Sequence, residues 1–450
     1  MAVSGRFVAL LAVGLVPVVL LGATAPGAYL ALGCWLLFCC VLGVVDLMAA
    51  SSPRRVLLAR SIPARVRLGE TVTATIAVTN LGTRRLRGTL RDGWQPSAGA
   101  APSRAGLDVP AGERRMLRLT LTPRRRGTRR VEFVAIRAAG PLGLWSRQAT
   151  LAAPGELRVL PPFHSRRHLA SRIARLRELD GSTPVMVRGE GTEFDSLREY
   201  VAGDDVRSID WRATARTSAA ARAGSGIMVR TWRPERDRRV VIVIDTGRSS
   251  AARIGDEPRL DTSFEAALLL AALADKGGDR VDVLAFDRRV RARVSGAKGP
   301  TLLSRLVGAL AHVQPELIET DWSAVPAQVR AITHRRALVV LLTDASAPGS
   351  SGGLLAALPP LTGSHAVVVA SVRDPRVTEL AGTAIDATRA GRSRMESFYG
   401  AAAAERALLD AGRVAEAIRM SGAGTVSAEP AELPPALADR YLELKASGRL

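Results

Sequence analysis

The sequence predicts an α/β domain with a parallel sheet covered by helices on both faces, preceded by a helical membrane hairpin and a small antiparallel β-sandwich. Three observations lead to this expectation. An apolar run at 240–244 has no polar interruption, which suits a strand buried on both faces. A second apolar run at 337–343 suits a strand of the same kind. Short runs within 54–162 alternate polar and apolar residues. Two apolar stretches open the chain.

Composition is that of a folded protein with several domains. The 450 residues are enough for about three domains, and a hydrophobic content of 47% is ample for buried cores. The net charge is +21, and only three of the 63 basic residues are lysine. Because this arginine bias accompanies heavy use of alanine and glycine, it is typical of GC-rich coding and weakens any argument from arginine number.

The two apolar stretches, 7–22 and 29–47, are separated by a break at Pro26 and Gly27. This pattern predicts a hairpin of two membrane helices, although the first stretch is near the lower limit of about 17 residues. A cleaved signal peptide with Arg6 in its charged region is the alternative. The second stretch would still anchor the protein in that case, but with inverted orientation.

Positive residues flank the hairpin at Arg6, Arg54 and Arg55, and the turn within it has no charge. Because positive residues favour the cytoplasmic side, we expect a multi-pass protein of the cell membrane whose soluble bulk is cytoplasmic. The soluble part has no disulfide framework. All three cysteines lie in the second apolar stretch, at Cys34, Cys39 and Cys40.

The predicted sandwich spans 54–162, with alternating runs at 71–78, 116–122 and 130–136. It contains no catalytic constellation, so we interpret it as a spacer or binding module. Residues 51–180 contain 26 arginines and eight acidic residues. This excess predicts contact with anionic membrane lipids, with a merely solvated surface as the alternative. Nucleic acid is not expected as a partner, since aromatic residues make up only 4% of the chain and no binding motif is present.

Residues 163–236 interleave acids with arginines, which predicts a folded ion-pair network. A metal or acid/base cluster is the alternative, but the interleaved part of this segment has no histidine. The acidic residues are Glu190, Glu193, Asp195, Glu199, Asp204, Asp205 and Asp210, and the arginines are Arg188, Arg198, Arg207, Arg212 and Arg216.

Each of the two apolar runs of the α/β domain leads into an aspartate, Asp245 or Asp344. The carboxyl ends of parallel strands meet at one edge of a sheet, where ligands bind. Carboxylates and nearby hydroxyls, such as those of Ser249, Ser250 and Thr320, suit Mg²⁺. The alternative is that both aspartates only cap the helices that follow.

This edge resembles the metal-ion-dependent adhesion site of von Willebrand factor A domains, which reads Asp-x-Ser-x-Ser, then a threonine, then an aspartate. The matching positions here are Asp245, Gly247, Ser249, Thr320 and Asp344. The resemblance implies a von Willebrand A-like fold, a Rossmann-like parallel sheet with helices on both faces. It also implies Mg²⁺ held by Asp245, Ser249, Thr320 and Asp344, and completed by an acidic group of a partner. Gly247 departs from the pattern and removes one hydroxyl ligand.

The motifs GEGTEF, REYVAGDDVRSIDW and ATART, between 189 and 217, resemble the signature of the DUF58 family. The terminal YLELKASGRL fits as well, so that the resemblance covers about 160–450. It implies partnership with a MoxR-type AAA ATPase, not a reaction.

Together these observations predict a membrane-anchored adaptor rather than an enzyme. The alternatives are a metal-dependent hydrolase that uses Asp245 and Asp344, and a metal-free structural module with a vestigial site. No histidine neighbours either aspartate in sequence to act as a base. The expected domains are 1–50 (two transmembrane helices), 54–162 (β-sandwich), 163–236 (signature segment) and 237–450 (von Willebrand A-like domain).

Overall fold

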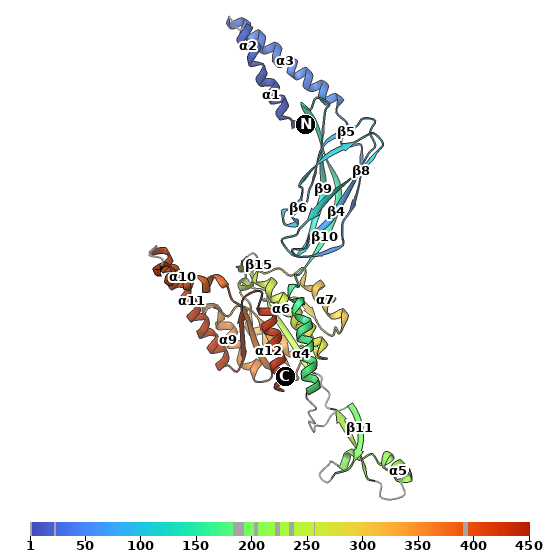
Figure 1. Ribbon diagram of the computed structural model, residues 1–450, viewed down its shortest axis with the longest axis vertical. Coiled ribbons are helices and arrows are strands. Elements are labelled where there is room, and N and C mark those ends of the chain that lie inside the picture. Colours follow the sequence, from blue (N-terminus) through green and yellow to red (C-terminus); the bar gives the residue numbers. More distant parts are fainter. Residues whose placement is uncertain are drawn as a thin grey trace. The chain divides into compact units, whose positions relative to one another are not determined.

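A computed structural model describes residues 2–21, 24–182, 193–201, 206–220, 226–233, 238–255, 257–346, 348–389 and 395–450. The chain divides into two compact units (Figure 1). The sandwich unit comprises Met1–Pro162 with Leu310–His312, and the α/β unit comprises Phe163–Ala309 with Val313–Leu450.

Three helices open the sandwich unit, α1 (Gly5–Val13), α2 (Leu15–Leu21) and α3 (Ala25–Ala49). The first two lie beside α3 (Figure 1), and the indole Nε1 of Trp35 donates to the carbonyl of Leu10 at 3.3 Å. Among the described helices, only α3 is long and apolar enough to cross a membrane. The structure thus supports one candidate span and not the predicted pair. The reason is that the first stretch is interrupted at Gly14, and helices of nine and seven residues fall short of a bilayer about 30 Å thick.

Asp46 is an acidic residue within the apolar helix α3, and it is fully buried. Its carboxylate accepts hydrogen bonds from the backbone N–H groups of Leu142 (2.7 Å), Leu144 (2.7 Å) and Trp145 (3.0 Å). These residues form the turn between β9 (Gly127–Ala139) and β10 (Trp145–Leu160). The charge is therefore explained by a structural task, which is to fasten the end of α3 to the sandwich.

Two sheets form the sandwich, with strand orders β1-β10-β9-β5-β7 and β2-β4-β8-β6. All pairs are antiparallel except β3–β10. Ile76 and Leu119 of one sheet share a buried cluster with Leu90 and Val134 of the other, so the sheets pack face to face. The other strands are β1 (Ala2–Val3), β2 (Val56–Ser61), β3 (Arg65–Arg67), β4 (Val72–Asn80), β5 (Leu86–Asp92), β6 (Ala100–Ala101), β7 (Arg104–Val109) and β8 (Arg114–Leu121).

The α/β unit is built on a six-stranded sheet of order β17-β16-β13-β18-β19-β20. Five strands are parallel, but β17 is antiparallel to β16. The prediction of a wholly parallel sheet is therefore wrong at this edge. Only 287–289 connect the two strands, and a parallel pair would need a much longer crossover. The strands are β13 (Arg239–Asp245), β16 (Arg280–Phe286), β17 (Val290–Val294), β18 (Leu338–Leu342), β19 (Ala366–Val372) and β20 (Gly424–Ala428).

Helices cover both faces of this sheet. On one face α8, α9 and α11 join a buried cluster with alternate residues of β13 and β18, such as Val243 and Leu341. On the other face α6 and α12 pack together against the sheet (Figure 1). The helices of this unit are α4 (Leu169–Ser182), α6 (Arg259–Lys276), α7 (Pro300–Leu310), α8 (Val325–Arg330), α9 (Pro348–Thr362), α10 (Pro375–Arg389), α11 (Met395–Met420) and α12 (Leu433–Ala446). Sequence patterns did not predict α10.

The signature segment contains an antiparallel pair, β11 (Glu193–Glu199) with β12 (Met228–Arg233), and the helix α5 (Trp211–Ala220). Asp210 caps α5, because its Oδ1 accepts from the backbone N–H groups of Arg212 and Ala213, both at 3.0 Å. Its Oδ2 pairs with Nε of Arg230 at 2.7 Å, so one predicted acid has an arginine partner from outside the interleaved run. Several members of the predicted network lie outside the described residues, namely Arg188, Glu190, Asp204 and Asp205.

Candidate functional site

The predicted site residues lie at the carboxyl edge of the sheet. Asp245 ends β13 and Asp344 follows the neighbouring parallel strand β18. Ser249 lies in the 3₁₀ helix η4 (Arg248–Ala251), and Thr320 lies in the loop before η5 (Trp322–Ala324). Parallel pairing of the two strands therefore brings residues from three distant segments to one edge.

Asp245 is the centre of this edge and is only 2% exposed. Its Oδ1 accepts from the N–H of Gly247 at 2.8 Å and from the hydroxyl of Thr320 at 2.5 Å. Its Oδ2 accepts from the hydroxyls of Ser249 at 2.8 Å and Thr343 at 2.7 Å. Four donors thus saturate one buried carboxylate. Sequence reasoning missed Thr343, although its place at the end of an apolar run beside Asp344 was a usable signal.

Asp344 is not part of that hydrogen-bond set and pairs instead with Arg259, the first residue of α6. Nη1 of Arg259 lies 2.7 Å from Oδ2 of Asp344 and donates to the carbonyl of Ser249 at 3.0 Å. The two side chains are only 10% and 13% exposed. No motif in the sequence around Arg259 indicated this role.

Gly247, where the resembled motif has a serine, is closely surrounded. A Cβ at this position would lie 2.3 Å from Oγ1 of Thr320, 2.8 Å from the carbonyl oxygen of Ile318 and 3.1 Å from Oδ1 of Asp245. The loop of Ile318 is held there, because the N–H of Arg248 donates to the same carbonyl at 2.8 Å. A serine side chain therefore has no space at this position.

These contacts do not fit a bound Mg²⁺. The ion needs near-octahedral oxygen ligands at about 2.0–2.1 Å. Here the hydroxyls donate directly to Asp245, Gly247 supplies no hydroxyl, and a guanidinium group neutralises Asp344. Over the described ranges, no group of three or more His, Cys, Asp or Glu residues is arranged to hold a metal ion.

Asp287 ties the loops of this edge together. Its Oδ2 accepts from the hydroxyl of Thr246 at 2.9 Å and from Nε of Arg291 at 2.5 Å, while Oδ1 accepts from the N–H groups of Arg288 and Arg289. Its carbonyl accepts from the N–H of Asp321 at 2.9 Å. Burial raises the pKa of Asp287, but the hydrogen bonds from Arg291, the backbone and Thr246 outweigh it, and the pKa is lowered overall.

Comparison with known proteins shows what this chain is related to. Residues 196–394 match the model of a family described as protein of unknown function DUF58. The chain therefore contains a DUF58 region. The match confirms the resemblance carried by the signature motifs, but it is shorter than the expected range of about 160–450.

Curated relatives of this DUF58 chain include uncharacterised proteins of Mycobacterium bovis and Mycobacterium tuberculosis. They are 26% identical over 204 residues, which is 45% of this chain and 61% of theirs. The chain therefore spans about three fifths of the length of these relatives, and they indicate no activity.

Solved structures resemble only parts of the DUF58 chain. The SpRpn10 VWA domain matches 46% of the chain and 94% of its own length, with 11% identity and a TM-score of 0.26. The CARDB domain of a Pyrococcus furiosus protein matches 25% of the chain and 94% of its own, with 14% identity and a TM-score of 0.18. A β-glucosidase from Listeria innocua matches 24% of the chain and 16% of its own length, with 16% identity and a TM-score of 0.17. Likenesses at this level carry no argument about function.

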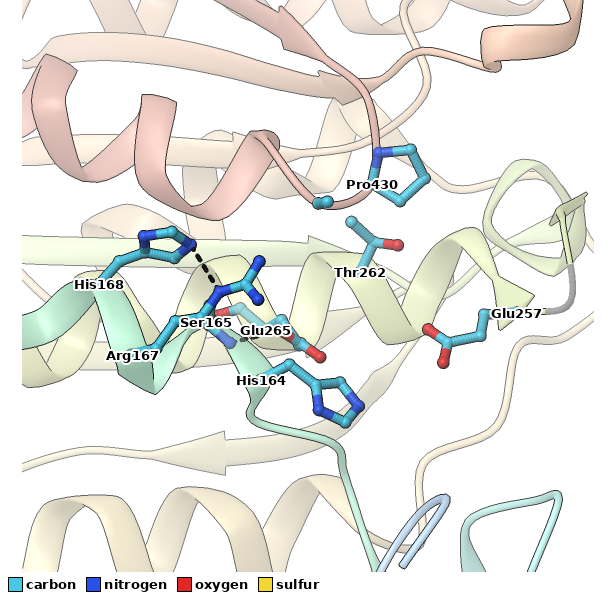
Figure 2. Close-up of a pocket in the computed structure, with 9 residues that line it drawn as sticks. His164, Ser165, Arg167, His168, Glu257, Thr262, Glu265 and Pro430 are labelled. Atoms are coloured by element: carbon cyan, nitrogen blue, oxygen red, sulfur yellow. Dashed lines mark hydrogen bonds between the residues drawn. The ribbon is translucent and has the colours of Figure 1, made fainter.

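The DUF58 chain also has a cavity of about 200 Å³ between η2 (His164–His168), β15 (Glu257–Pro258), α6 and the segment 430–431 (Figure 2). The N–H of Ser165 donates to Oε2 of Glu265 at 3.0 Å, and Nε of Arg167 donates to Nε2 of His168 at 3.1 Å (Figure 2). Burial and the nearby Arg167 and Arg172 lower the pKa of His168. The cavity is smaller than most ligand pockets, which measure roughly 300–1,000 Å³.

Proposed function

We propose that this protein is an interaction module that recognises a protein partner through the carboxyl edge of its α/β sheet, and that it is not an enzyme. We call this surface the recognition edge and define it as the loops 246–251, 287–289, 316–321 and 344–346. The observation that carries the proposal is the saturated carboxylate of Asp245. A carboxylate that accepts four hydrogen bonds holds its loops in place and is not available as a nucleophile or base.

The rim of the recognition edge has the chemistry of a binding surface. Leu317 is 77% exposed in the loop that carries Thr320. Beside it, Arg248 pairs with Glu319 at 2.9 Å, and both side chains are more than half exposed. An apolar anchor on a rigid loop, with charged groups around it, is the arrangement that partner proteins bind.

The partner that we propose is a MoxR-type AAA ATPase, on the strength of the family resemblance. In pull-down assays the full chain in detergent should retain the purified ATPase, and Leu317→Asp should reduce retention at least about tenfold, as expected for a hot-spot anchor. The matched control is Leu409→Asp, since Leu409 is 63% exposed on α11 away from the recognition edge. Equal retention by all three proteins would contradict the proposed surface, and no retention by the wild type would contradict the partner.

We also propose that α3 anchors the protein in the cell membrane, with the arginine-rich sandwich unit facing anionic lipids on the cytoplasmic side. Arginines at the end of α3 support this, because Nη1 of Arg84 donates to the carbonyl of Met48 at 2.7 Å and Nε of Arg147 to that of Leu47 at 3.0 Å. Carbonate extraction of membranes tests the anchor, and the mass of the mature N-terminus tests the signal-peptide alternative. Release of the protein by carbonate would contradict anchoring.

A further inference from the structure

We propose that the guanidinium group of Arg259 takes the place of a divalent cation at the recognition edge, so that the edge is complete without metal. The statement that partner binding needs no metal rests on the proposed function. The charge balance of the site does not rest on the proposed function, because it concerns only residues of this chain.

Arg259 is a buried positive charge whose contacts lie inside the recognition edge. Its Nη1 forms an ion pair with Oδ2 of Asp344 and donates a hydrogen bond to the carbonyl oxygen of Ser249. The hydroxyl of Ser249 in turn donates to Asp245. The residue is only 9% exposed, and within the described chain its Nε has no hydrogen-bond partner. A buried guanidinium in this setting needs a carboxylate as counter-charge, and Asp344 provides it.

Electrostatic repulsion argues against an additional ion beside Asp344. Arg259 already supplies a positive charge there, and its guanidinium group also donates to the carbonyl of Ser249. A divalent cation coordinated by Asp344 would lie within a few ångströms of the guanidinium, and this repulsion is strong where water is excluded. Metal could bind only if Arg259 left its partner.

The surroundings of Gly247 point to the same conclusion independently. The carbonyl of Ile318 and the hydroxyl of Thr320 fill the space that a serine side chain would need. Thr320 uses its hydroxyl to donate directly to Asp245 at 2.5 Å. The edge has thus lost a ligand and the space for that ligand.

The first test is titration of the full chain in detergent with Mn²⁺, followed by electron paramagnetic resonance of the free ion, together with thermal unfolding in EDTA and in millimolar Mg²⁺ or Mn²⁺. We expect no Mn²⁺ binding at millimolar metal and the same Tm in every condition. Binding that a chelator reverses and that raises Tm would overturn the proposal, unless Asp344→Ala retains it, which would place the ion elsewhere and leave the proposal standing.

The second test removes the internal cation. Arg259→Ala should lower Tm by about 5–15 °C, as expected when a buried ion pair is broken. It should also create a response to Mn²⁺, since the carboxylate of Asp344 then has no positive partner. Arg259→Lys, which keeps the charge, should not respond. Absence of any Mn²⁺ response in Arg259→Ala would overturn the idea that the guanidinium stands in for the ion.

A matched control is available at the opposite end of β13. Arg239 pairs with the buried Asp282 at 2.8 Å, so Arg239→Ala also breaks an ion pair of the same sheet, away from the recognition edge. It should lower Tm without creating a response to Mn²⁺. A response equal to that of Arg259→Ala would show unspecific binding and overturn the assignment. If Arg259→Ala does not fold, the wild-type titration decides alone.

Discussion

Nζ of Lys445, in the last turn of α12, lies 3.1 Å from Oδ1 of Asp279, the residue before the strand β16, and both side chains are buried. Lys445 also donates to the carbonyl of Gly277 at 2.8 Å, and the hydroxyl of Tyr441 donates to Oδ2 of Asp279 at 2.5 Å. Asp279 follows the turn at Gly277 and Gly278. Its buried partners show that it fastens the C-terminal helix to the sheet.

Lys445→Met should destabilise the α/β unit by about 3–5 kcal/mol, because it leaves Asp279 buried without its cation. Unfolding in urea, followed by tryptophan fluorescence, measures the change. Lys276→Met is the control, since Lys276 is exposed and substitutions of that kind stay within about 0.5 kcal/mol. A loss equal to that of the control would mean that the ion pair does not hold α12 in place.

Gly247→Ser restores the letters of the adhesion motif but should not restore a metal site. The new Cβ would lie 2.8 Å from the carbonyl oxygen of Ile318, and we expect a destabilisation of about 1–3 kcal/mol, as for other overpacked sites. Thermal unfolding with and without Mg²⁺ measures both effects. Gly352→Ser is the control, because nothing lies within 4 Å of a Cβ there. A stable variant that binds Mg²⁺ would contradict our account of this glycine.

Asp46→Ala should loosen the junction between α3 and the sandwich, because three N–H groups, of which that of Leu144 is buried, lose their acceptor. We expect faster proteolysis in the turn 140–145 and a lower Tm for the sandwich unit, measured on the full chain in detergent. Asp46→Asn keeps one carbonyl acceptor and should lie between the wild type and alanine. Protection of the turn equal to the wild type in both variants would show that the carboxylate is dispensable.

Asp287 should make the α/β unit less stable in acid. Its pKa is lowered in the folded state, so its contribution is present above the unfolded pKa of about 3.9 and is lost as the pH falls through the folded value. Urea unfolding at a series of pH values from neutral to acidic measures the slope. Asp287→Asn should reduce the loss of stability below about pH 4. An exposed control, Glu416→Gln, should leave the slope unchanged, and an unchanged slope in Asp287→Asn would refute the assignment.

Local sequence patterns located most elements of the α/β unit. The apolar runs at 240–244 and 337–343 became β13 and β18, because an uninterrupted apolar run is stable only when both faces are covered. The antiparallel edge strand β17 was also readable in principle, since three residues cannot form a crossover. The helix α10 was missed, and the first apolar stretch was taken as one helix although it is interrupted at Gly14.

The sequence predicted some residues of the candidate site and missed others. It placed Asp245 and Asp344 at one edge of the sheet, because each follows an apolar strand and the two strands are parallel. It did not show that the hydroxyl of Thr343 would donate to Asp245 or that Arg259 would pair with Asp344. These partners lie far apart in the chain, and sequence patterns report only periodicity and local turn chemistry.

The sequence by itself determined where the strands, helices and apolar segments lie, because periodicity and turn residues act over a few neighbouring positions. Only the tertiary structure decided which charges meet. Lys445 and Asp279 are 166 residues apart, and the order of strands in the sheet brings them together. Likewise, the space around Gly247 is set by the distant carbonyl of Ile318. Whether an aspartate faces a metal or a guanidinium is therefore a property of packing, not of the motif.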